Sequence, residues 1–174
     1  MTARNAARPD SPPGRGFLPA PLYKTIYSLV PIVCVDILIH RPGAFALGLR
    51  MEEPARGQWF PPGGRVYKGE TLKQAARRKL REEIGLNAPQ SQFTCLGVWE
   101  TMFKTSSLGG SKHTVNVVFA FDLGKRTLPP LDRRHHAQLR WFSVPGRSWH
   151  PYVKALLATA GFGFPGLKFS LERR

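Results

Sequence analysis

This chain has few cysteines, no long hydrophobic run and few acidic residues. Its two cysteines, Cys34 and Cys95, each lie alone in an apolar run without the spacing of a metal site. They are therefore predicted to be buried, reduced thiols. No apolar run approaches the length of a membrane span, and the first residues lack the hydrophobic segment of a secretory signal. We therefore expect a cytoplasmic protein.

The shortage of acidic residues leaves a large positive charge. The 174 residues include 26 Lys plus Arg against 11 Asp plus Glu, which gives a formal net charge of +15 and a pI near 10.8. Such a charge favours a polyanionic partner. A nucleoside diphosphate and a nucleic acid both fit this description, and charge alone does not choose between them.

The order of the apolar segments predicts one α/β domain. Residues 1–21 are rich in proline, arginine and alanine without periodicity, so we expect a flexible basic arm followed by a single domain over residues 22–174. Strands are predicted over residues 26–40, 44–50, 94–103, 114–122 and 138–142, and a terminal helix from Pro151 to a stop at Gly161. Strands interrupted by one strong central helix indicate an α/β/α sandwich around a mixed sheet.

The central helix can be recognised from both of its ends. Thr71 followed three residues later by Gln74 is a capping-box pattern, and Gly85 is a residue that readily closes a helix in the left-handed conformation. These signals predict a helix over residues 72–84. An apolar stripe facing a core is expected at Leu72, Ala76, Leu80 and Ile84. Charged residues are expected to cover the rest of the helix: Lys73, Arg77, Arg78, Lys79, Glu82 and Glu83.

Three of the 11 acidic residues fall in or beside this helix: Glu70, Glu82 and Glu83. Adjacent carboxylates project about 100° apart on a helix, so Glu82 and Glu83 can reach one hard cation such as Mg²⁺ from neighbouring directions. The alternative is a solvated face with two i,i+4 ion pairs, Arg78 with Glu82 and Lys79 with Glu83. The helix by itself leaves both interpretations open.

The loop before the helix completes a known pattern. A proline pair precedes Gly63 and Gly64, which predicts a sharp, exposed turn whose backbone can approach a ligand closely. From Gly64 the chain resembles the Nudix signature, G-x5-E-x7-R-E-U-x-E-E-x-G-U, in which U is a bulky aliphatic residue. Every fixed position from Gly64 to Leu86 matches except Lys79, where the family has glutamate.

A wider resemblance covers residues 31–142, where the segments VDILIH, GQWFPPGGRV and RHHAQLRWF are similar to the GDP-mannose mannosyl hydrolase branch of the Nudix family. The resemblance implies use of Mg²⁺, with Mn²⁺ as an alternative, and attack at the sugar carbon with release of GDP. It also assigns Arg50 and Arg65 to the diphosphate. Guanidinium groups bind phosphate oxygens bidentately and can stabilise the charge on the leaving group.

Two further positions carry candidate chemistry. Asp36 interrupts a buried strand, so it is expected either to form an ion pair or to face a ligand cavity, and the resemblance implies bonds to sugar hydroxyls. Histidine accepts a proton near neutral pH. Alignment on Arg140 and Trp141 places His136 where the mannosyl hydrolases carry their general base. The alternative for His136 is a surface histidine in a polar loop.

The resemblance also implies a set of cation ligands. They are the Gly63 carbonyl, Glu83, Glu82 and diphosphate oxygens, and His135 stands where the branch has a metal-binding glutamine. An imidazole suits Mg²⁺ less well than a carbonyl oxygen. The branch has no acid at the position of Glu82, so Glu82 is expected to compensate for the weaker ligand at position 135. Lys79 cannot ligate a cation, and its charge is expected to lie against phosphate or to pair with Glu83.

The predicted function is Mg²⁺-assisted hydrolysis of a nucleoside diphosphate sugar, with Arg50 and Arg65 on the departing diphosphate and His136 activating water. Three alternatives stay open: a Nudix pyrophosphohydrolase that attacks phosphorus, a nucleotide-binding protein without turnover, and a nucleic-acid-directed enzyme or RNA-binding module. The histidine with which the branch touches its substrate is missing near Glu100 and Thr101, so the sugar is not identified. A homodimer is expected, with residues 162–174 as a candidate docking segment.

Overall fold

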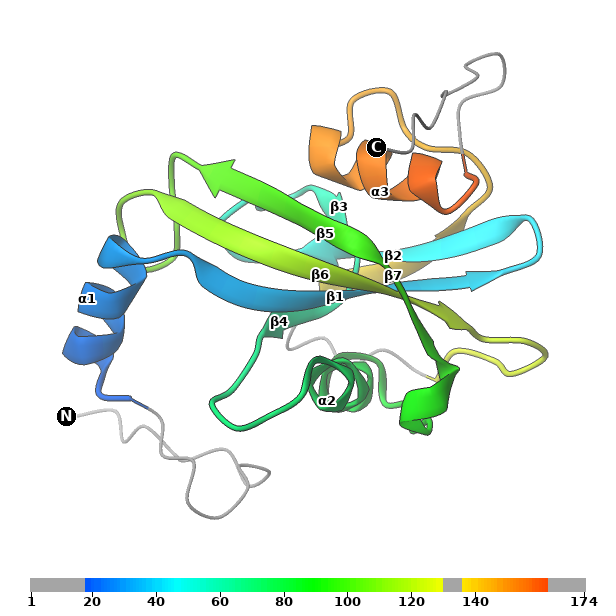
Figure 1. Cartoon of the computed structure of the whole chain (residues 1–174). Coiled ribbons are helices and arrows are strands. Elements are labelled where there is room, and N and C mark those ends of the chain that lie inside the picture. The colour runs from blue at the N-terminus through cyan, green and yellow to red at the C-terminus, as the bar shows by residue number, and fades with distance from the viewer. Residues whose placement is uncertain (1–17, 130–135, 163–174) are drawn as a thin grey trace, which may run out of the picture.

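The computed structural model describes residues 18–129 and 136–162, except for the side chains of residues 136 and 137. The elements, in chain order, are α1 (Ala20–Leu29), β1 (Ile32–Arg41), β2 (Ala44–Arg50), β3 (Trp59–Phe60), β4 (Gly63–Arg65), α2 (Leu72–Ile84), a 3₁₀ helix (Gln90–Gln92), β5 (Phe93–Phe103), β6 (Lys112–Asp122), β7 (His136–Phe142) and α3 (Pro151–Thr159). Figure 1 shows the strands as one twisted sheet between α2 and α3. Across the described part of the chain, helices are too short or too polar to span a membrane.

The seven-stranded sheet is mixed. β1 lies at its centre and pairs in parallel with β6, whereas the β1–β2, β1–β4, β2–β7 and β5–β6 pairs are antiparallel. On its other side β1 has two successive partners. It pairs with β2 only over Ile39 to Arg41 and with the short β4 over Cys34 to Asp36. β1 and β2 therefore part toward the beginning of β1, and β4 lies beside β1 there.

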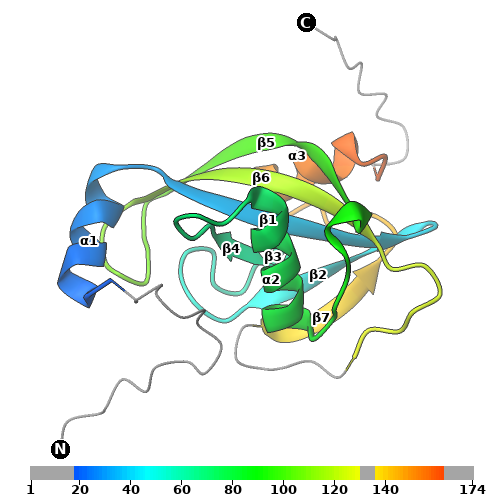
Figure 2. The same cartoon turned by 60° about the horizontal axis from the view of Figure 1, so that its bottom comes forward.

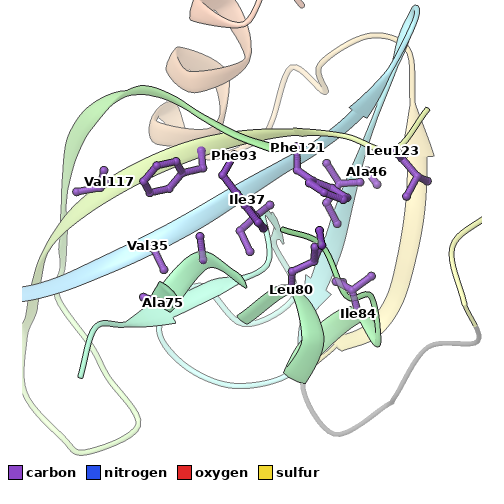
Figure 3. Close-up of a cluster of buried hydrophobic side chains, with 14 residues drawn as sticks. Val35, Ile37, Ala46, Ala75, Leu80, Ile84, Phe93, Val117, Phe121 and Leu123 are labelled. Atoms are coloured by element: carbon purple, nitrogen blue, oxygen red, sulfur yellow. The ribbon is translucent and has the colours of Figure 1, made fainter. Parts of the chain in front are cut away.

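One helix covers each face of the sheet, as the two views in Figures 1 and 2 show. α2 buries Leu80 and Ile84 against one face, where they meet Ile37 and Phe121 of the sheet (Figure 3). α3 belongs to the second cluster, on the opposite face, through apolar residues such as Leu156. Burial of apolar side chains on both faces is the main stabilising contribution to such a sandwich. The predicted α/β/α sandwich around a mixed sheet is confirmed.

The central helix forms over the predicted residues. The Gln74 N–H donates to Thr71 Oγ1 at 3.2 Å, and the Thr71 N–H donates to the Gln74 side-chain oxygen at 2.8 Å, which completes the capping box. Gly85 ends the helix with φ of 78°. Because both ends are defined by local interactions, sequence rules locate this helix well. The predictions for β2, β5, β6, β7 and α3 are also confirmed within a few residues.

The predicted strand over residues 26–40 is wrong in its first part, because residues 20–29 form α1. Pro19 and Pro21 favour the start of a helix, and Pro31 keeps Val30 extended, so the strand begins only at Ile32. The expected boundary between arm and domain, at residue 21, falls inside α1. Residues 1–17 lie outside the described residues.

One of the two cysteine predictions is also wrong. Cys34 is buried as expected, and burial raises the pKa of its thiol to about 12. Cys95 is exposed. It lies next to a bulge between Cys95 and Gly97 in β5, where the pairing with β6 shifts by one residue. An apolar run therefore did not imply burial at this position.

Candidate active site

A cavity of about 160 Å³ lies beside the place where β1 and β2 part. Residues of β1, β2 and β4 line one side, β5 and β6 line another, and single residues of α2 and α3 complete the wall. Its charged and polar lining residues are Asp36, Arg50, Glu83, Thr101, Lys112, Thr114, Asn116 and Tyr152. A concave site with several convergent polar groups is the usual form of a ligand pocket.

Four of the residues singled out from the sequence meet in this cavity. Asp36 comes from β1, Arg50 from the end of β2, Gly63 from β4 and Glu83 from the last turn of α2. These residues are distant in sequence, and the pairing of β1 with β4 brings Gly63 opposite Asp36. The candidate site from the sequence is thus assembled in space from four separate elements.

Asp36 faces the cavity and has no ion pair within 4.0 Å among the described residues. Its Oδ2 accepts a short hydrogen bond from the Tyr152 hydroxyl of α3. Burial raises the pKa of Asp36 to about 6, with Glu83 adding to the rise and the Tyr152 hydrogen bond and Arg50 opposing it. Of the two expectations for Asp36, the structure therefore agrees with the cavity and not with an ion pair.

The glycine at position 63 is required by close packing. A Cβ atom at this position would overlap Asp36 Oδ1 and the carbonyl oxygen of Val35. Gly63 lies in a paired strand, and the two prolines before it are buried, so the predicted sharp and exposed turn is wrong. Glycine lets β4 approach the Asp36 carboxylate, and the close approach of this backbone to a ligand stays a prediction.

The two arginines assigned to the diphosphate lie in different surroundings. Arg50 lines the cavity, where its Nε donates to the Pro54 carbonyl at 2.7 Å and its guanidinium lies 5.5 Å from the Phe60 ring centroid. Arg65 is not among the lining residues. Its guanidinium lies 4.3 Å from the ring centroid of Tyr23 in α1. The structure thus places Arg50 in the cavity and Arg65 against α1.

Arg78 forms a buried network with two glutamates. Its Nε lies 2.7 Å from Glu70 Oε1 and its Nη1 lies 3.2 Å from Glu82 Oε2, while its Nη2 donates to the Arg65 carbonyl at 3.0 Å. The Arg78 side chain is only 8% exposed. The expectation that Arg78 lies on an uncovered helix face is wrong, because the loop between β4 and α2 covers that side.

Lys79 bridges the two adjacent acids of the helix. Its Nζ lies 3.2 Å from Glu82 Oε2 and 3.2 Å from Glu83 Oε1. The other oxygen of Glu83 accepts from the Gly63 N–H at 3.2 Å, so Glu83 connects the helix to β4. Burial lowers the pKa of Lys79, but Glu83 and Glu82 outweigh this effect and raise it above its ordinary value. Like Arg78, Glu83 is buried and not on a solvated face.

The carboxylates of Glu82 and Glu83 both contact the Lys79 ammonium, so they can reach one cation together. Carboxylate oxygens are ligands that suit a hard cation. Within the described residues, no three His, Cys, Asp or Glu side chains come together as a metal site. The donor set therefore fits a divalent ion through two carboxylates, with further oxygens to come from the Gly63 carbonyl and from a phosphate ligand. Glu83 lines the cavity, and Glu82 does not.

The sequence analysis missed the part of the cavity lined by β6. Lys112, Thr114 and Asn116 follow one another at every second position of β6, so their side chains share one face of the strand. The Thr114 hydroxyl donates to Asn116 Oδ1 at 3.0 Å and shares a hydrogen bond with Thr101 of β5. Burial lowers the pKa of Lys112. Three polar residues at alternate positions, in the first half of a strand whose second half is mainly apolar, were the available signal.

The two histidines can be placed only in part. The backbone of His136 begins β7, and its Cα pairs with that of Arg50 in β2. β7 therefore runs next to a residue that lines the cavity. The side chain of His136 and all of His135 lie outside the described residues, as do residues 163–174 of the predicted docking tail.

Comparisons with known proteins identify the family of the chain. The NUDIX domain model matches residues 30–146. The low-salt glycan biosynthesis protein Agl8 of Haloferax volcanii is 39% identical over 156 residues, which are 88% of this chain and 95% of that protein. An ADP-ribose pyrophosphatase of Methanocaldococcus jannaschii is 33% identical over 95 residues, which are 55% of this chain and 53% of that protein.

The fold is also similar to solved structures. The crystal structure of a MutT NUDIX hydrolase from Burkholderia pseudomallei superposes with a TM-score of 0.64, covering 75% of this chain and 98% of the other, at 24% sequence identity. At this level of identity the likeness concerns the fold.

Proposed function

Because the chain belongs to the NUDIX domain family, we propose that it is a hydrolase of a nucleoside diphosphate sugar in which water attacks the anomeric carbon. GDP-mannose is the first substrate to test. The observation that carries the proposal is the composition of the cavity. It combines Asp36 and the polar groups of β6, which suit sugar hydroxyls, with Arg50, which suits a diphosphate.

Each residue has a defined part in this proposal. Arg50 binds the diphosphate from the end of β2. Arg65 lies against α1 outside the cavity, so it has no part in this proposal. The Asp36 carboxylate accepts hydrogen bonds from sugar hydroxyls, with its orientation held by Tyr152. His136, whose Cα is paired with that of Arg50 between β2 and β7, acts as general base.

The reaction breaks one bond and forms one. The oxygen of water bonds to the anomeric carbon while the His136 imidazole takes a proton from that water. The bond from the anomeric carbon to the diphosphate oxygen breaks, and its electron pair leaves with the nucleoside diphosphate. Arg50 neutralises the charge that develops there. A bound divalent cation, held by Glu83, Glu82 and the Gly63 carbonyl, would supply further charge neutralisation of the diphosphate.

Hydrolysis in ¹⁸O-labelled water tests the site of attack. The protein is incubated with Mg²⁺ or Mn²⁺ and a panel of nucleotide sugars that includes GDP-mannose, and the products are analysed by mass spectrometry. We expect the label in the sugar. Label in a phosphate would instead show attack at phosphorus, and binding without conversion of any substrate would indicate a nucleotide-binding protein.

His136→Ala tests the assignment of the general base. We expect turnover to fall by roughly 10²- to 10⁴-fold with little change in substrate binding, because the imidazole acts on water and not on the sugar nucleotide. Single-turnover rates and equilibrium binding would be measured in parallel. Arg140→Ala in the same strand is the control, and activity of His136→Ala equal to the wild type would remove the histidine from the mechanism.

Attack at phosphorus is the second candidate, and one observation favours it. The adjacent acids Glu82 and Glu83 are both retained and both face one cationic group. The ADP-ribose pyrophosphatase relative supports the same class of activity. ADP-ribose should therefore be included in the substrate panel, where release of AMP would favour this candidate.

A further inference from the structure

Lys79 is held in place more firmly than a surface lysine. Its side chain is 12% exposed, and the two acids that it bridges are 19% and 6% exposed. A Cβ atom on residue 64 would lie 2.7 Å from Lys79 Cε, so the side chain of Lys79 packs directly against Gly64 of β4. An exposed i,i+4 pair would be mobile and screened by solvent. This ammonium is enclosed between α2 and β4.

The position of the ammonium is where a cation shared by Glu82 and Glu83 would bind. One positive charge already lies 3.2 Å from an oxygen of each carboxylate. Lys79, Glu82 and Glu83 together carry a net charge of −1, and glutamate in place of Lys79 would make it −3. Arg78, which lies 3.2 Å from the same Glu82 oxygen, adds one positive charge in both cases. A divalent ion approaching this cluster meets both weaker attraction and direct repulsion from the ammonium.

We propose that the Lys79 ammonium takes the place of one divalent cation, so that this site binds fewer divalent ions, and binds them more weakly, than it would with a neutral or acidic residue at position 79. The proposal deepens the proposed function, since it concerns the cation requirement of the same site. It assigns to Lys79 a permanent role as a cation that neutralises Glu82 and Glu83 and positions them beside Gly63.

The test counts Mn²⁺ ions bound to the protein in the absence of any substrate. Free Mn²⁺ is followed by electron paramagnetic resonance, and binding heats are followed by calorimetry. Lys79→Gln removes the charge at similar length, and we expect it to bind Mn²⁺ at least about tenfold more tightly than the wild type. Lys79→Glu adds a carboxylate, and we expect roughly 100-fold tighter binding with one additional ion per chain.

Two controls locate the effect. Lys73→Gln changes the net charge equally at an exposed position of the same helix, and its Mn²⁺ affinity should equal that of the wild type. In the double variant Lys79→Gln, Glu83→Gln, the gain in affinity should disappear. Circular dichroism and thermal unfolding confirm that each variant is folded before titration.

The proposal is overturned if Lys79→Gln binds Mn²⁺ no more tightly than the wild type. It is also overturned if Lys73→Gln gains as much affinity, or if the gain survives loss of Glu83. Because no substrate is present, these results do not depend on whether a nucleotide sugar is hydrolysed. Failure of the proposed reaction and failure of this inference are therefore observed separately.

Discussion

The charged residues of α2 and those of β1 and β6 differ in their partners. On the α2 side, Arg78 and Lys79 lie outside the lining of the cavity, and each is within 3.2 Å of two glutamate side chains. On the β1–β6 side, Asp36 and Lys112 line the same cavity, and neither has an ion pair within 4.0 Å among the described residues. The charges of α2 are satisfied before any ligand arrives, whereas those of β1 and β6 are not.

This difference separates charges that maintain the fold from charges available to a ligand. Breaking a buried ion pair leaves the remaining charge uncompensated and is strongly destabilising. A buried charge without an ion-pair partner already costs stability, and a ligand of opposite charge or with hydrogen-bonding groups can compensate it. Substitutions on the two sides should therefore differ in whether they change folding or ligand binding.

Glu83 takes part in the ion pairs of α2 and also lines the cavity. Its substitution should therefore have the largest effect. Glu83→Gln keeps an oxygen that can accept from the Gly63 N–H but removes the charge. We expect turnover to be nearly abolished, by on the order of 10⁴-fold, because the cation site loses a carboxylate. Steady-state kinetics on the substrate identified above measure the effect. Retention of a substantial part of wild-type activity would exclude Glu83 from the cation site.

Arg78→Met should mainly affect folding. The substitution leaves Glu70 buried without its guanidinium partner, so the free energy of unfolding should fall by about 3 kcal/mol. Urea denaturation followed by circular dichroism measures this change. Arg77→Met, at the exposed neighbouring position, is the matched control and should change stability little. Equal stability of the two variants would show that the buried network does not maintain the fold.

Asp36 should make stability depend on pH. Its pKa in the folded protein, about 6, lies above the ordinary value of 3.8, so between these pH values the folded state binds more protons than the unfolded state. The contribution of Asp36 to stability is therefore present at low pH and falls as the pH rises to 6.

Asp36→Asn removes this dependence. Relative to the wild type it should gain little stability near pH 4 and about 3 kcal/mol at pH 7. Its binding of the sugar nucleotide should become weaker. Denaturant unfolding of both proteins across this pH range provides the measurement. A constant difference between the two curves would show that the carboxyl group does not titrate in this window.

Lys112→Met should have the smallest effect on stability. Burial lowers the pKa of Lys112, because the folded state disfavours its charged form. This desolvation cost offsets the stabilisation from the contact between the ammonium and the Tyr27 ring. We expect the free energy of unfolding to change by less than about 1 kcal/mol. The KM should rise, since a cation facing the substrate is lost. Lys104→Met, at an exposed position, is the control. A large loss of stability in Lys112→Met would show that Lys112 maintains the fold.

Local rules predicted much of the fold. The ends of α2 depend on Thr71, Gln74 and Gly85, which interact within a few residues, and alternating apolar patterns located most strands. The failures also have physical causes. Prolines on both sides made residues 20–29 helical, although part of this segment is as apolar as a strand.

The candidate site was predicted on one side only. The Nudix-like segment led to Glu83 and Gly63, and strand patterning led to Asp36. Tyr152 could not be connected with Asp36, because the contact joins residues 116 positions apart. Helical periodicity correctly placed Ala76, Leu80 and Ile84 toward the core, but the prediction for Leu72 was wrong, since it is 39% exposed at the start of α2. Periodicity does not report that β4 lies beside the helix, so the burial of Glu83 was missed.

The hydrogen bond between Tyr152 and Asp36 joins a residue that is synthesised early to one that is synthesised late. Asp36 is synthesised early, on the central strand, whereas its hydrogen-bond donor arrives with α3, near the end of the described chain. During translation the strand can pair with its neighbours while this carboxylate still faces water. The pocket is therefore complete only when α3 has packed on the sheet, and a chain that ends before Pro151 would lack both Tyr152 and the apolar residues of α3 that cover this face.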